Sequence, residues 1–249
     1  MIARLRAIAF DVLFYAGSVP LVLFACACGL VGGATMRRGV LLWFQYHRLV
    51  SRYVLGIETR ITGAPRPEGP ALYVAKHQSF YETFELTRIL GAPVVVMKRE
   101  LGDIPFWGWI AKRYGAIMVD RDASSQALRE MMRQAQAARA AGRPVLLFPE
   151  GTRIEPGQTP ALKSGFAGLY RALGLPAVPI ALETAKVWPR KGMKRAGVVE
   201  FRFGEALPPG MKREAIEAAA HAGINVFEDE RLVGGEAVGG GGDGDGDGR

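Results

Sequence analysis

The chain has 249 residues, a formal net charge of +8 and a pI near 9.7, so its surface attracts anions such as nucleic acid, anionic lipids or phosphorylated small molecules. This length suits one α/β catalytic domain with a short appendage. The two cysteines, Cys26 and Cys28, lie in an apolar run, which supports neither a disulfide framework nor a zinc site. We expect no metal and no cofactor.

The amino-terminal part of the chain is a candidate membrane anchor. Residues 7–35 are largely apolar, and arginines flank them on both sides at Arg4, Arg6, Arg37 and Arg38. Asp11 and Pro20 interrupt the run, and matching basic flanks favour a hairpin dipping into one leaflet over a single span, although both stay open. Leu23-Phe24-Ala25-Cys26 resembles a lipoprotein processing site, but the apolar run continues past it, which argues against a cleaved signal peptide.

A second amphiphilic stretch, residues 41–55, combines aromatic and basic side chains. This pattern suits the lipid headgroup region, and it equally suits an amphipathic helix packed on a domain. We interpret residues 1–56 as the anchor with its interfacial helices and residues 57–232 as the catalytic domain. Residues 233–249 are rich in Gly and Asp, so we expect a disordered tail there.

Beyond the anchor, short β-rich runs alternate with helical patterns. Strands are predicted at 72–75, 94–97, 116–119, 145–148, 177–182 and 199–203. The clearest helix is predicted over 124–141, starting at Asp122 or the following serines and stopping at Gly142, with its arginines on a solvated face. This alternation predicts an α/β fold in which helices flank a largely parallel, mixed sheet.

The most informative segment follows the 72–75 strand, at the edge where parallel sheets bind ligands. His77 could act there as a base, and Glu82 could fix its tautomer and stabilise the imidazolium. This geometry requires His77 to precede a helix and Glu82 to lie in the first turn of that helix. Ser79 followed by Glu82 also fits a helix capping box, in which Glu82 would only bind backbone N–H groups.

A second segment, Phe148-Pro149-Glu150-Gly151-Thr152-Arg153, follows the 145–148 strand. Gly151 allows close backbone approach, and the guanidinium of Arg153 suits a phosphate. Glu150 could hold Arg153 or meet a substrate hydroxyl. The alternative is a plain turn with a local Glu–Arg ion pair.

Cations recur where predicted strands end. Lys98 follows the 94–97 strand and Arg121 follows the 116–119 strand, so together with Arg153 they could form one anion pocket, although each alone is more often a surface charge. Val178-Pro179-Ile180 reads as a buried strand that shapes an apolar floor.

Four sequence blocks in this order resemble those of the bacterial lysophosphatidic acid (1-acyl-sn-glycerol-3-phosphate) acyltransferase family, within the glycerolipid acyltransferase superfamily. The family shows His-x4-Asp, Gly-x-Ile-x-x-x-Arg, Phe-Pro-Glu-Gly-Thr-Arg and Val-Pro-Ile. This chain carries the corresponding blocks at 77–82, 115–121, 148–153 and 178–180. The resemblance covers roughly residues 40 to 210, and four ordered blocks are far more specific than any single one.

The resemblance implies transfer of an acyl group from acyl-CoA or acyl carrier protein to the sn-2 hydroxyl of lysophosphatidate, which gives phosphatidate. The enzyme would work on the cytoplasmic face of the inner membrane, with lipids as partners and no nucleic acid. It implies His77 as the base and Glu82 as its orienting carboxylate. The substrate-binding set it implies is Lys98, Arg121, Glu150, Gly151, Thr152 and Arg153. Glu82 stands where the family has Asp, which lengthens the reach to His77 by one methylene and leaves the acceptor more open than the reaction class.

Other classes of function fit less well. The nucleophile elbow Gly-x-Ser-x-Gly of serine hydrolases is missing around Ser164, and no glycine-rich phosphate loop ends in Gly-Lys-Ser/Thr. Nucleic-acid binding is suggested by the pI alone. Another lysolipid acceptor, or a lipid-binding homologue without catalysis, remains an alternative.

Overall fold

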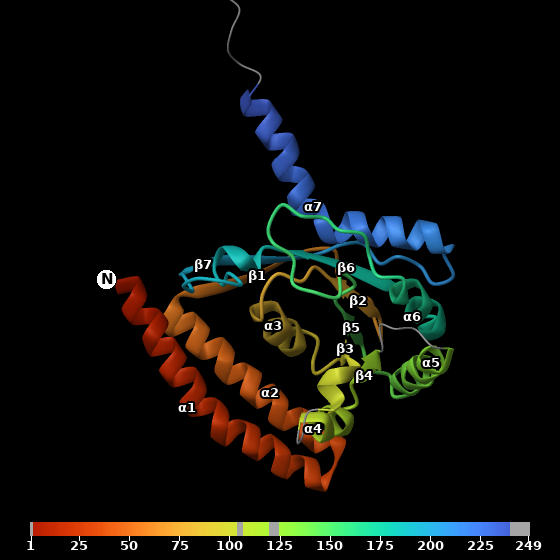
Figure 1. Cartoon of the computed structure of the whole chain (residues 1–249), viewed down its shortest axis with the longest axis horizontal. Helices are drawn as coiled ribbons and strands as arrows, with labels where there is room; N and C mark the ends of the chain where they lie inside the picture. Colours follow the sequence, from red (N-terminus) through yellow and green to blue (C-terminus); the bar gives the residue numbers. More distant parts are fainter. Residues whose placement is uncertain (1, 104–106, 120–124, 240–249) are drawn as a thin grey trace, which may run out of the picture.

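A computed structural model describes residues 2–103, 107–119 and 125–239. In this part of the chain, the core is a seven-stranded sheet with the order β1-β7-β6-β2-β5-β3-β4 and helices on both faces (Figure 1). The strands are β1 (Ile57–Gly63), β2 (Leu72–Ala75), β3 (Val94–Lys98), β4 (Ile117–Val119), β5 (Val145–Leu147), β6 (Ala177–Leu182) and β7 (Gly197–Phe203). The helices are α1 (Ile2–Val31), α2 (Gly33–Val50), α3 (Tyr81–Ile89), α4 (Trp107–Tyr114), α5 (Ser125–Ala140), α6 (Gly165–Leu173) and α7 (Arg213–Gly239).

Strands β6, β2, β5, β3 and β4 run parallel to one another, whereas β7 pairs antiparallel with β6 and β1 pairs parallel with β7. The predicted α/β fold with a largely parallel, mixed sheet is therefore correct. All predicted strands are present. Strand β1 was not predicted, because only Ile57 is buried in this edge strand and its charged, exposed positions hide the β pattern.

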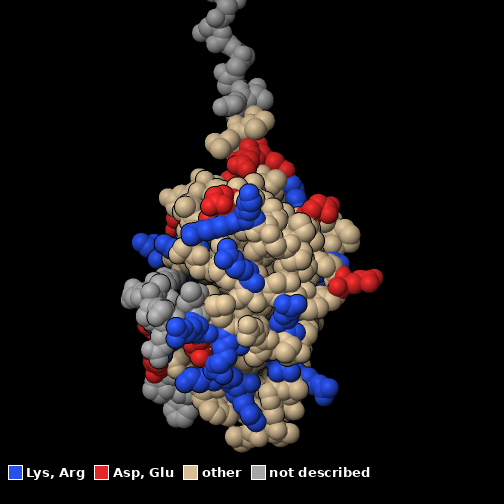
Figure 2. Space-filling model, turned by 90° about the vertical axis from the view of Figure 1, so that its right-hand side faces the viewer, with Lys and Arg blue, Asp and Glu red and all other residues tan. Residues whose placement is uncertain are grey.

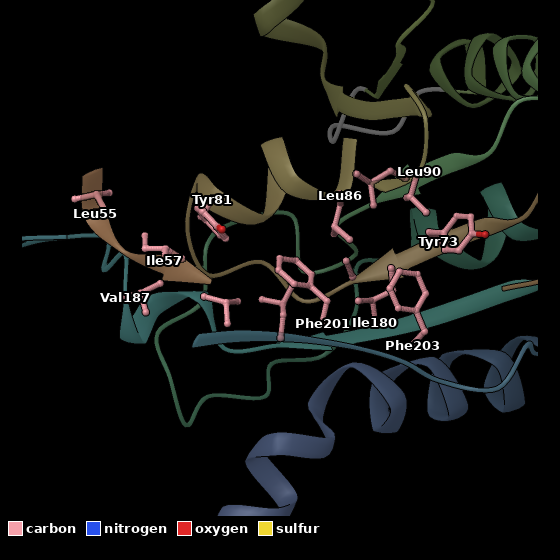
Figure 3. Close-up of a cluster of buried hydrophobic side chains, with 14 of the residues drawn as sticks. Leu55, Ile57, Tyr73, Tyr81, Leu86, Leu90, Ile180, Val187, Phe201 and Phe203 are labelled. Carbon is pink, nitrogen blue, oxygen red and sulfur yellow. The ribbon is translucent and has the colours of Figure 1, made fainter. Parts of the chain in front are cut away.

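The period of two along each strand separates the core into two layers. Tyr73 and Ala75 pack on the face covered by α3 and the start of α1, and Figure 3 shows Tyr73 in this layer with Tyr81 and Leu86 of α3. Leu72 and Val74 belong to the opposite layer, under α5, α6 and α7. Both faces of β2 are buried, so packing on both sides fixes the position of this strand. The loop between β2 and α3 therefore begins at a fixed point.

Helices α1 and α2 form an antiparallel hairpin along the α3 side of the molecule (Figure 1). Asp11 and Pro20 do not interrupt α1, and the turn lies at Gly32 instead. The helices approach closely where Gly39 faces Ala25, since a Cβ on Gly39 would lie 2.8 Å from the Cα of Ala25. Among the described helices, α1 is the one long and apolar enough to cross a membrane, and its most apolar window is only 17% buried, which points to membrane association.

Two predicted segments differ from the structure at their ends. Helix α5 closely matches the predicted helix, with Arg129, Arg133 and Arg139 exposed as expected, but the predicted start at Asp122 lies outside the described residues. The backbone of α7 continues to Gly239, so the tail is helical where disorder was expected from residue 233. Residues 240–249 lie outside the described residues.

Candidate active site

The site is built on the loop between β2 and α3. His77 lies two residues beyond the end of β2, and Glu82 lies in the first turn of α3. The Nδ1 atom of His77 is 2.8 Å from Oε1 of Glu82, and 19% of the His77 side chain is exposed while that of Glu82 is fully buried. The predicted pair therefore forms, with its imidazole at the surface and its carboxylate beneath.

The Glu82 carboxylate binds several donors at once. Oε1 accepts hydrogen bonds from the backbone N–H groups of Gln78 (2.7 Å) and Ser79 (2.6 Å), and Oε2 accepts from the hydroxyls of Ser79 (2.8 Å) and Thr184 (2.6 Å). The contacts expected from the capping interpretation and those expected from the catalytic interpretation are thus both present. Glu82 closes the start of α3 and orients His77 with the same two oxygens.

These hydrogen bonds also set the charge of Glu82. Burial alone would raise the pKa of this carboxyl group, but the hydrogen bond and charge of His77, with the Thr184 hydroxyl and the Ser79 N–H, lower the pKa below its ordinary value. Glu82 is therefore a carboxylate at neutral pH. A carboxylate only accepts hydrogen bonds, so Nδ1 of neutral His77 carries the proton and Nε2 holds the free lone pair that a base needs.

The segment after β5 packs directly against His77. The Phe148 ring stacks on the imidazole with ring centroids 4.3 Å apart and an interplanar angle of 26°, and the Ile154 N–H donates to the His77 carbonyl at 2.7 Å. The chain turns back between them at Gly151, whose φ of 69° suits glycine. The Arg153 guanidinium lies over the Phe80 ring, 4.3 Å from its centroid. The structure thus brings the His77 and Arg153 segments together.

Glu150 has a different place from the one predicted. Its side chain is fully buried, with Oε2 accepting from the His77 N–H at 2.8 Å and Oε1 lying 3.3 Å from Lys76 Nζ. Burial raises the pKa of Glu150, while the Lys76 ammonium and the His77 N–H oppose that rise. The prediction that Glu150 binds Arg153 or substrate is therefore wrong. It joins the end of β5 to the loop that carries His77.

The structure describes two of the remaining predicted substrate-binding residues, Lys98 and Thr152, but not Arg121. Lys98 ends β3, where it pairs with Val119 of β4. Its side chain is 40% exposed and pairs with Glu100 at 2.5 Å. Thr152 is exposed beside Arg153. Arg121 lies outside the described residues.

Sequence reasoning missed several residues that bind His77, Glu82 or their loop, among them Thr184 and Lys76. Thr184 follows β6 and reaches Glu82, and no local motif marks it. Lys76, next to His77, is fully buried, and its ammonium is bound by acceptors from three separate segments. A lysine in a surface-loop motif ordinarily reads as an exposed charge, so only the packed structure shows this role.

Two cavities lie away from His77. One of about 510 Å³ is lined by Arg99, Lys112, Arg133 and Arg143 among others, and one of about 470 Å³ is lined by Arg66 and Tyr73 among others. Within the described residues, no three His, Cys, Asp or Glu side chains are grouped to hold a metal ion. The His77 site thus carries an imidazole and a guanidinium on adjoining loops, groups that are able to act as a general base and to bind a phosphate.

Comparison with known proteins identifies the family of the chain. Residues 56–183 match the family model described as Acyltransferase. The chain is 35% identical over 167 residues to a 1-acyl-sn-glycerol-3-phosphate acyltransferase of Pseudomonas aeruginosa, covering 66% of this chain and 65% of the relative. It is 29% identical over 251 residues to one of Chlamydomonas reinhardtii, covering 94% and 73%.

A solved structure shares the fold. The crystal structure of the 1-acyl-sn-glycerophosphate (LPA) acyltransferase PlsC from Thermotoga maritima matches with a TM-score of 0.72 and 20% identity, covering 92% of this chain and 98% of that one. Since the family model spans more than half of the chain and includes His77, Glu82 and Arg153, this chain belongs to the acyltransferase family.

Proposed function

We propose that this acyltransferase is a 1-acyl-sn-glycerol-3-phosphate O-acyltransferase. It transfers an acyl group from acyl-CoA or acyl carrier protein to the sn-2 hydroxyl of lysophosphatidate, and phosphatidate is the product. The observation that carries the proposal is the 2.8 Å contact between Nδ1 of His77 and the buried carboxylate of Glu82, with Arg153 on the adjoining loop. The names of the curated relatives support this choice of acceptor.

The reaction needs no acyl-enzyme. His77 Nε2 takes the proton of the sn-2 hydroxyl as its oxygen attacks the thioester carbonyl, and the tetrahedral intermediate then collapses with loss of the thiolate, which takes the proton back from the imidazolium. Glu82 stabilises the imidazolium between these two steps. A positioned base contributes about 10²- to 10⁴-fold, so binding and orientation of both substrates supply the rest.

Charge supports an anionic acceptor and an anionic donor. Figure 2 shows Lys and Arg side chains gathered on the side of the molecule where α5 and α6 lie in Figure 1. Together with the net charge of +8, this surface attracts phosphate-bearing substrates. In the proposal, Arg153 binds the acceptor phosphate, with Lys98, Arg121, Gly151 and Thr152 as further contacts.

The apolar α1 helix supports a site at the membrane surface, where lysolipid acceptors reside. We place the catalytic domain on the cytoplasmic face of the inner membrane, because acyl-CoA and acyl carrier protein are cytosolic donors. In this arrangement, the exposed ring of Phe80, 53% exposed beside Arg153, lies at the entrance from the lipid.

The test is an acceptor panel. The full chain, purified in detergent, is incubated with labelled acyl-CoA or acyl carrier protein and with lysophosphatidate, lysophosphatidylcholine, lysophosphatidylethanolamine, glycerol 3-phosphate or no acceptor, and products are separated by mass. The proposal predicts phosphatidate from lysophosphatidate and thiol release only with that acceptor. Preferred transfer to a zwitterionic lysolipid would change the acceptor, thiol release without acceptor would indicate a hydrolase, and no reaction with any acceptor would indicate a lipid-binding protein.

A further inference from the structure

Two polar side chains of α7 are buried beneath the site. Helix α7 packs on β6 and β2, on the sheet face opposite α3 (Figure 1). Asn225 is 1% exposed and Glu228 is 3% exposed. Both lie outside residues 56–183, the part of the chain that matches the family model. Burying a carboxylate costs free energy unless the carboxylate is paired. The partners of Glu228 therefore show which part of the structure α7 stabilises.

The first partner is Lys76, the residue before His77. Its Nζ donates to Asn225 Oδ1 at 2.6 Å, to the Gln158 carbonyl at 2.8 Å and to Glu150 Oε1 at 3.3 Å, and Glu228 Oε1 lies 3.7 Å away. An ammonium has three N–H donors, and these acceptors use all of them. Lys76 is fully buried, so it does not reach substrate and instead fixes the backbone on one side of His77.

The second partner is Gln78, the residue after His77. Its Nε2 donates to Glu228 Oε1 at 3.3 Å, and its Oε1 accepts from the Ala185 N–H at 3.2 Å. The same carboxylate oxygen of Glu228 therefore lies near Lys76 and Gln78. Both neighbours of His77 are held by α7, and the other Glu228 oxygen is bound by Arg231 at 2.7 Å.

We propose that Asn225 and Glu228 are positioning residues that hold His77 in its catalytic orientation through Lys76 and Gln78. The inference rests on the proposed function, in which His77 is the base. The contact with Glu82 orients the His77 ring but does not hold its backbone. The contacts of Lys76 and Gln78 with α7, and the hydrogen bond from the His77 N–H to Glu150, fix the position of the His77 backbone. Displacing a catalytic group by about 1 Å costs on the order of 100-fold in rate.

The predicted signature is a loss of kcat at constant KM. Neither α7 side chain is exposed to substrate, so ground-state binding stays unchanged when either is altered. Glu228→Gln keeps the side-chain shape and removes the charge, and Asn225→Leu removes the acceptor for Lys76. Asp229→Asn is the matched control, because it removes one charge from an exposed side chain on the same helix.

The experiment measures kcat and KM for lysophosphatidate with acyl-CoA as donor. The kcat is expressed per folded molecule, with the folded fraction taken from circular dichroism melting curves. We expect kcat to fall roughly 10-fold in Glu228→Gln and on the order of 10- to 100-fold in Asn225→Leu, with KM within about twofold and Asp229→Asn equal to the parent. If Asn225→Leu does not fold, the result for Glu228→Gln alone tests the inference.

A parental kcat per folded molecule in Glu228→Gln, or a raised KM at unchanged kcat, overturns the inference, whereas the proposed function is retained as long as the parent acylates lysophosphatidate. A parent that acylates no lysolipid overturns the proposed function, and this inference with it.

Discussion

The hydroxyl of Thr184 donates a 2.6 Å hydrogen bond to Oε2 of Glu82, across 102 residues of sequence. This bond ties the segment after β6 to the first turn of α3. It also helps to lower the pKa of Glu82 and so keeps the partner of His77 ionised. The ionisation of Glu82 therefore depends in part on a residue that no motif contains.

Replacing Thr184 with valine removes this hydroxyl and keeps the shape of the side chain. Hydrogen bonds to charged groups contribute about 1.5 to 3 kcal/mol, and part of that loss reaches the His77 imidazolium, so we expect kcat to fall roughly 10-fold. Steady-state kinetics with lysophosphatidate measure the effect. Thr184→Ser keeps the donor and should recover most of the rate; equal losses in both variants would show that the hydroxyl is not responsible.

Glu82→Asp tests the departure from the family motif. Aspartate is one methylene shorter, so it would no longer reach both Thr184 and the N–H groups of Gln78 and Ser79. Each buried donor left unpaired costs about 1 to 3 kcal/mol. We expect a lower melting temperature and at least a 10-fold lower kcat. An aspartate variant as active and as stable as the parent would mean that the loop adapts freely to either acid.

Arg153 should act on substrate binding more than on chemistry. Arg153→Lys loses the planar fork of donors that matches a phosphate, so we expect KM for lysophosphatidate to rise about 10-fold while kcat changes little. Arg171→Ala, which removes an exposed arginine on α6, serves as the control and should leave KM unchanged. Should KM rise equally for an acceptor without phosphate, such as a monoacylglycerol, Arg153 is not the phosphate ligand.

His47 makes stability depend on pH. It is fully buried among aromatic rings, and desolvation, with the nearby Arg48 charge, lowers its pKa from 6.5 to about 3. The native state keeps His47 neutral while the unfolded chain binds a proton below pH 6.5, so stability is complete above pH 6.5 and falls as pH drops from 6.5 toward 3. At pH 5 the loss is about 2 kcal/mol.

Melting temperatures at pH 7 and pH 5 check this dependence. His47→Phe should reduce the drop between the two values, because the aromatic site then holds no titrating group. His221→Phe, at a histidine that is not buried, should keep the parental drop. An unchanged drop in His47→Phe would assign the pH dependence to other groups.

The sequence predicted the two strands that precede the His77 and Arg153 segments, but not that these strands, β2 and β5, pair directly and so bring the two segments together. Local spacing likewise placed Glu82 in the first turn of α3. The role of Glu150 could not be predicted, because its partner Lys76 becomes apparent only from the strand register and the burial of the loop. The contribution of α7 depends on how a distant helix packs, and no pattern in the sequence encodes that contact.

In the proposed reaction, His77 removes the proton of the acceptor hydroxyl. The most direct measurement compares acyl transfer to lysophosphatidate by the parent, His77→Ala and the control His221→Ala, with melting temperatures for each. We predict a kcat per folded molecule at least about 100-fold lower in His77→Ala alone. Its melting temperature should fall only modestly, because Glu82 loses one partner but keeps its bonds to Thr184 and the α3 turn. A folded His77→Ala variant that transfers acyl groups at the parental rate would show that His77 is not the base.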